Sequence, residues 1–118
     1  MNACYLIRQP EIDQLIFNWQ TNQPLRGTTG EIDFQPVVHL SIPILNFHWL
    51  LTELEPEGDI AFGLADLNSQ CPELGYVSLD ELKQVSQKSF TIRQMDFQAN
   101  MTLSQYAEVA SIAGQIIV

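Results

Sequence analysis

Four carboxylates occur at every second position near the middle of the chain, and their spacing is the first indication of chemistry. They are Glu53, Glu55, Glu57 and Asp59. Carboxylates two apart along an extended strand can share one face and together coordinate a hard cation. These four, however, straddle a turn and lack the ligand spacing of a calcium loop. The pattern therefore favours a solvated, charged hairpin tip over a metal site.

Two histidines, His39 and His48, could serve as a general acid or base with one of these carboxylates. Each is expected on the face opposite its most apolar neighbours, which favours a surface or hydrogen-bonded role over catalysis. Cys71 lies in a loop before a proline, with no basic residue nearby in the sequence to activate it. No nucleophile elbow, P-loop, dinucleotide fingerprint or zinc pattern occurs. The sequence thus predicts no catalytic residue, no cofactor and no metal ligand.

The distribution of charge says more than its total. Five basic and fourteen acidic residues give a net charge of −9, and the stretch between Arg26 and Lys83 contains no Lys or Arg. This balance disfavours direct contact with nucleic acid or anionic membranes. A dense negative face can instead bind a basic protein, although the same charge could simply maintain solubility. The predicted contact surface consists of Glu53, Glu55, Glu57, Asp59, Asp66 and Glu73.

The chain is short enough for one domain spanning residues 1–118, and its 46% hydrophobic content is sufficient for a core. Its first residues lack a basic segment followed by an apolar block and a cleavage site, which predicts a cytoplasmic protein. In that reducing compartment Cys4 and Cys71 are expected to be free thiols, with a disulfide between them left open.

A helix is predicted from about residue 10 to residue 22, because Pro10 suits a first turn and apolar residues follow at helical spacing. The expected buried face consists of Ile12, Leu15, Ile16 and Trp19, widened by Phe17. A loop rich in Gly, Thr and Pro follows, over residues 22–31.

Alternating apolar residues predict four consecutive strands, over about residues 37–42, 47–54, 59–67 and 74–78. Pro43 blocks the first strand and suggests a position at the sheet edge. Residues 56–59, with the sequence PEGD, predict the turn of a hairpin. The third strand has a face of small residues, Ala61, Gly63 and Ala65, on which a helix is expected to pack.

Two capping-box patterns mark later helices, Ser78 with Glu81 and Thr102 with Gln105. A last strand, about residues 90–97, separates them, and Gly114 is placed to end the second helix. The apolar tail, residues 114–118, is expected to dock on the body or on another subunit of a homo-oligomer. Together, these helices and strands predict an α+β fold with a mainly antiparallel sheet of about five strands.

Two segments, WLLTELEPEGDIAFGLADL and PELGYVSLDEL, resemble a family of small bacterial proteins classed as a domain of unknown function. The resemblance is specific over about residues 36–97, and it includes Ile92 and Arg93 of the last strand. It implies proteins often carried on plasmids and other mobile elements, and it transfers no catalytic residue.

These observations favour a non-enzymatic interaction protein, with inhibition of a basic or DNA-binding partner as the sharpest hypothesis. The alternative is a small enzyme or ligand-binding protein with a pocket near His48, Asp66, Glu73 and Tyr76.

Overall fold

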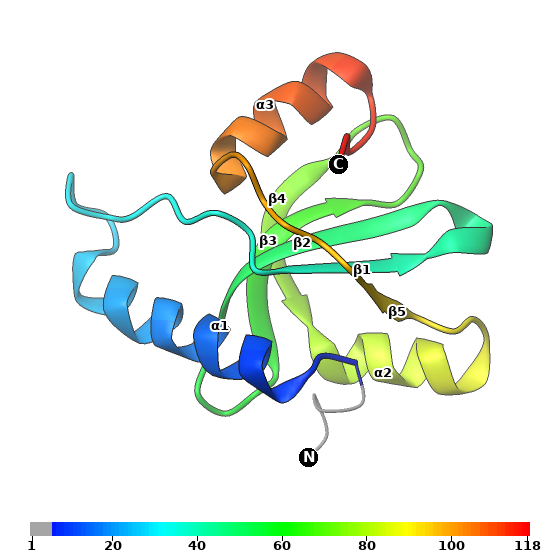
Figure 1. Cartoon of the computed structure of the whole chain (residues 1–118), viewed down its shortest axis with the longest axis horizontal. Coiled ribbons are helices and arrows are strands. Elements are labelled where there is room, and N and C mark those ends of the chain that lie inside the picture. Colours follow the sequence, from blue (N-terminus) through cyan, green and yellow to red (C-terminus); the bar gives the residue numbers. More distant parts are fainter. Residues whose placement is uncertain (1–5) are drawn as a thin grey trace.

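A five-stranded sheet, antiparallel throughout, has the strand order β4-β3-β2-β1-β5 (Figure 1). The structure is a computed structural model and describes residues 6–118. The strands are β1 (Val38–Ile42), β2 (Phe47–Leu54), β3 (Ile60–Asp66), β4 (Glu73–Ser78) and β5 (Arg93–Met95). The helices are α1 (Gln9–Asn22), α2 (Leu79–Lys88) and α3 (Leu103–Ala113). The predicted α+β class is confirmed.

Two apolar cores lie on opposite faces of the sheet. Figure 1 shows α1 and α2 on one side of the sheet and α3 on the other. The larger core joins Leu15 of α1 and Leu79 of α2 to Leu40, Leu51 and Leu54 of the strands. The second core joins Leu50 and Leu64 to α3, through the residues Leu103, Tyr106 and Ala110. The domain is therefore three layers deep, with the sheet in the middle.

The alternation of β2 is interrupted by a β-bulge at Thr52. Leu51 pairs with Gly63, but the next pair is Glu53 with Phe62, so Thr52 is the extra residue. The bulge lets Leu51 and Leu54 enter the same core, although three positions separate them. It also moves Glu53 to the face that a regular strand would have given to Leu54.

Gly63 is required where β3 passes the bulge. A Cβ atom on Gly63 would lie 2.0 Å from the backbone oxygen of Leu50 and 2.9 Å from Cα of Leu51. The prediction that a helix packs on the small face of β3 is therefore wrong at this position, since the neighbour is the β2 backbone. Ala61 does belong to the core formed with α1 and α2.

The helix ends follow the capping patterns. Ser78 Oγ accepts a hydrogen bond from Glu81 N (3.2 Å), and Gln105 Oε1 accepts one from Thr102 N (2.9 Å). Gly114 ends α3 with a φ of 77°, in the left-handed region that glycine adopts without strain. The starts of α2 and α3 and the end of α3 were thus readable from the sequence.

Several local predictions were wrong. Phe17 is exposed on α1, so it does not widen the buried face. β1 lies between β2 and β5, so Pro43 does not mark a sheet edge. The last strand covers only Arg93–Met95 of the expected eight residues. For the cysteines, Cys4 lies outside the described residues, and Cys71 is an exposed free thiol, as expected.

Two glycine substitutions test the close approach of β2 and β3. Gly63→Ala should lower the free energy of unfolding by about 3 kcal/mol or more, because the added methyl meets backbone that cannot rotate away. Gly75→Ala, at the paired position on β4, meets nothing within 4 Å and should change stability by less than about 1 kcal/mol. Urea unfolding measures both values, and equal losses would contradict the proposed role of Gly63.

Candidate functional site

Asp59 joins the β2–β3 turn to the start of α2. Its Oδ1 accepts hydrogen bonds from Ser78 Oγ (2.8 Å) and Asp80 N (3.1 Å), and its backbone oxygen accepts one from Leu79 N (2.8 Å). A carboxylate at the first turn of a helix also interacts favourably with the helix dipole. Asp59 therefore fixes the helix start against the turn.

This junction gathers five carboxylates, which we call the acidic corner: Glu55, Glu57, Asp59, Asp80 and Glu81. Glu57, Asp80 and Glu81 are exposed, while Glu55 and Asp59 are half-buried. Glu55 also orders the turn, since its Oε1 accepts a hydrogen bond from Ile60 N (3.2 Å). Asp80 and Glu81 were missed as candidate surface residues. The contact between turn and helix is a tertiary one, and only the cap at Ser78 hinted at it.

Glu53 does not belong to an exposed contact surface, contrary to the prediction from the sequence. It is only 4% exposed, and its Oε1 lies 2.7 Å from Nη2 of Arg26 in a salt bridge. Asn22 Nδ2 donates to the other oxygen at 3.2 Å. The Arg26 guanidinium in turn lies 4.6 Å from the centre of the Trp19 ring. Glu53 thus fastens the loop after α1 to the sheet, and it cannot present its carboxylate to a partner.

Asp66 is also buried, with 1% of its surface exposed. Its Oδ1 accepts from Asn68 N and its Oδ2 from Ile116 N, each at 2.9 Å. The second bond holds the C-terminal tail, where Ile116 packs into the core under α3. The tail therefore docks on the body, and a homo-oligomer through the exposed Ile117 and Val118 stays a prediction.

A further acidic side chain outside the corner, Asp33, holds the start of α3. Its carboxylate accepts hydrogen bonds from the backbone N and the hydroxyl of Ser104. Burial raises the pKa of Asp33, but the hydrogen bonds from Ser104 outweigh that effect and hold the pKa below its usual value. This part of the acidic excess is structural.

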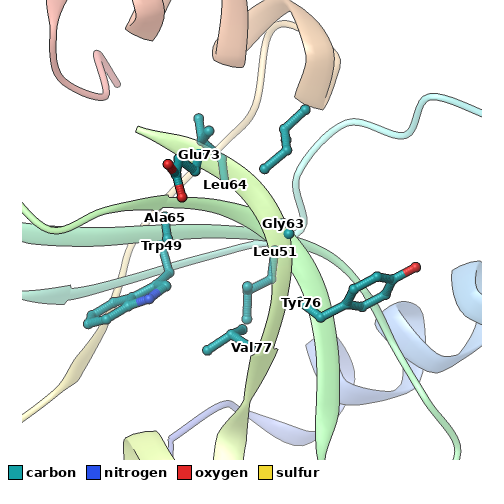
Figure 2. A pocket seen from close by; sticks show the side chains of 10 residues that line it. Trp49, Leu51, Gly63, Leu64, Ala65, Glu73, Tyr76 and Val77 are labelled. Atoms are coloured by element: carbon teal, nitrogen blue, oxygen red, sulfur yellow. The ribbon is translucent and has the colours of Figure 1, made fainter. Parts of the chain in front are cut away.

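The four residues of the predicted pocket do not converge. Glu73 and Tyr76 line a small hollow beside β4, together with Trp49 (Figure 2). His48 and Asp66 pair across β2 and β3 and do not line that hollow. The pocket predicted from the sequence therefore does not form around a common space.

The two histidines instead contact each other on the α3 face of the sheet. His39 Nε2 lies 3.0 Å from His48 Nδ1, and His48 Nε2 lies 2.8 Å from Oδ1 of Asn46. Burial lowers the pKa of His39 to about 4, with His48 adding to the effect. Burial also lowers the pKa of His48, although Asp66 opposes it. Both rings are therefore neutral at pH 7 and share one hydrogen bond.

A cavity of about 640 Å³ lies beside His39. Phe97, Asn100 and Tyr106 line it, and Tyr106 Oη donates to Oδ1 of Asn100 at 3.0 Å. Within residues 6–118 no group of three or more His, Cys, Asp or Glu side chains is placed to hold a metal ion. Nor does any described helix combine the length and apolarity needed to cross a membrane.

These features define the class: an acidic α+β domain protein in which some carboxylates anchor loops and helix starts and others are exposed, several of them at the acidic corner. The chain belongs to the family described as protein of unknown function, DUF2958, whose model matches residues 6–117. The resemblance to a family of unknown function is confirmed at that level. Comparison with curated proteins and with solved structures found no match.

The buried histidine pair predicts a pH-dependent stability. His39 has an unfolded pKa near 6.5 and a folded pKa of about 4, so below pH 6.5 the unfolded chain binds a proton that the folded chain does not. Stability should therefore fall as the pH drops from 6.5 to 4, by up to about 3 kcal/mol from this residue. Denaturant unfolding at several pH values would measure the slope, and His39→Gln should flatten it. An unchanged slope in this variant would show that His39 is not the cause.

Proposed function

We propose that this protein is a non-enzymatic interaction module that binds a basic protein through the acidic corner. The observation that supports the proposal is the junction at Asp59, which holds the turn carrying the exposed Glu57 against the start of α2, where Asp80 and Glu81 are exposed. Asp59 is already engaged with backbone and hydroxyl donors, so its role is to position the others.

The chemistry of the corner suits recognition of a cationic surface. A single exposed ion pair contributes only about 0.2–1 kcal/mol, but several on one surface add affinity and speed association by electrostatic steering. Glu73, at the far end of β4, adds a separate exposed carboxylate to the predicted contact. Binding of this kind weakens as salt rises, since exposed charges are screened.

Inhibition of a DNA-binding protein is the finer form of the proposal. A negative surface can occupy the cationic groove that would otherwise hold phosphates, and the mobile-element context implied by the family resemblance would give such an inhibitor a use. A cytoplasmic location in a bacterium belongs to the same proposal.

Ligand binding or catalysis is the second candidate, and the cavity beside His39 is the observation that favours it. Its wall combines an imidazole, a phenol and an amide with apolar side chains, as small-molecule sites do. The site would differ from the pocket predicted from the sequence, since none of the residues His48, Asp66, Glu73 and Tyr76 lines it.

Neutralising the acidic corner should weaken partner capture more than removing the same amount of charge elsewhere on the surface. The variant E57Q/D80N/E81Q should bind a basic partner about 5- to 30-fold more weakly, as three exposed ion pairs are worth about 1–2 kcal/mol together. The tagged full chain would be used in pull-downs from a bacterial lysate at about 50 and 500 mM salt. Captured proteins would be identified by mass spectrometry and their isoelectric points compared.

The matched control is D13N/D96N/E108Q, which removes the same amount of charge from exposed positions outside the corner. It should capture the partner almost as well as the wild type. Equal losses in both variants would assign the effect to net charge, and the absence of any salt-sensitive basic partner would contradict the proposal.

A further inference from the structure

β4 presents an open edge of the sheet. It is the terminal strand in the order β4-β3-β2-β1-β5, and within residues 6–118 no strand pairs with its other side. Its six residues include Leu74 and Tyr76, whose side chains are 47% and 62% exposed. An exposed strand edge of this kind is a template for another extended chain, because half of its backbone donors and acceptors face outward.

A hollow of about 120 Å³ lies beside this edge (Figure 2). The cross-strand pair of Gly63 and Gly75 lines it, together with Trp49 and Leu51. No side chain fits at Gly63, because the bulge brings the β2 backbone against it. A Cβ atom on Gly75, however, would meet nothing within 4 Å. Crowding by the backbone therefore explains why position 63 is a glycine, but it does not explain the glycine at position 75.

Both ends of β4 are acidic. Glu73 is exposed at its start, and the acidic corner begins at its end, where Ser78 is hydrogen-bonded to Asp59. The two ends are about 17 Å apart at the rise of an antiparallel strand. An extended segment lying along β4 would thus meet carboxylates at both of its ends.

We propose that an extended segment of the basic partner adds to the sheet as a sixth strand along β4. Its backbone pairs with the open edge, one apolar side chain enters the hollow over Gly75, and Lys or Arg residues near its ends meet Glu73 and the acidic corner. On the other face, alternate side chains of the segment contact Leu74 and Tyr76. This inference rests on the proposed function and specifies how the partner is recognised.

A second copy of this chain fits the edge poorly. Antiparallel pairing of two β4 strands would bring Glu73 of each copy next to the acidic corner of the other. Like charges placed opposite one another across strands are destabilising. The charge pattern therefore selects a basic segment over self-association.

A displayed library of random peptides of about seven residues, the length that spans β4, provides the probe. Selection against the full chain should enrich peptides with Lys or Arg near both ends and an apolar residue between them. Gly75→Val should reduce the affinity of a selected peptide by about tenfold or more, since the new side chain fills the hollow. Gly75→Ala should have a smaller effect. Valine suits a strand, so thermal unfolding should show that Gly75→Val is folded.

Backbone methylation of the selected peptide separates strand addition from other modes of binding. In an extended peptide, alternate backbone N–H groups point to opposite edges. Methylating every second nitrogen removes the donors of one edge and keeps every side chain. Methylating the set that faces β4 should abolish binding, while methylating the opposite set should leave it almost unchanged. Equal effects of the two sets, undiminished binding to Gly75→Val, or failure to enrich any such peptide would overturn the proposal.

The lysate partner distinguishes failure of this inference from failure of the proposed function. If Gly75→Val captures the salt-sensitive partner as well as the wild type does, strand addition is wrong and the acidic corner remains the contact. If the wild type captures no such partner, the proposed function itself fails.

Discussion

The β-bulge at Thr52 is the constraint from which most of the structure follows. One extra residue in β2 lets Leu51 and Leu54 enter the same core and turns Glu53 toward the opposite face. Glu53 then needs a partner, which Arg26 supplies from the loop after α1. The bulge also places the β2 backbone so close to β3 that only glycine fits at position 63. Because Gly63 and its cross-strand partner Gly75 both lack side chains, a hollow remains beside β4.

Among the fourteen acidic residues, two groups have different roles. Glu53, Asp33 and Asp66 accept hydrogen bonds from groups distant in the sequence and hold a loop, a helix start and the C-terminal tail. A carboxylate oxygen is a strong acceptor for backbone N–H groups, so these positions need acidic residues for structural reasons. The exposed carboxylates at the two ends of β4 have no such anchoring role, and they are the ones available to a partner.

The sequence was informative wherever a local pattern decides the structure. The order of elements, the meander of four strands and the caps at Ser78, Thr102 and Gly114 all depend on neighbours within a few residues. Glu53 was misplaced because strict alternation along β2 put it with Glu55 and Glu57, and a bulge has no dependable local signal. The burial of Asp66 and the contact between Asp59 and Asp80 depend on long-range packing, which no spacing in the sequence reveals. The separation of His48 and Asp66 from Glu73 has the same origin.

The central claim is that a basic partner binds along β4 and the acidic corner. Amide hydrogen–deuterium exchange of the full chain, alone and bound to the captured partner, tests it most directly, because strand addition must protect the backbone of the edge. The account predicts slower exchange in residues 73–78 and 55–59 on binding, with α3 unchanged. Slower exchange confined to α3 and residues 95–101, around the cavity beside His39, would contradict it.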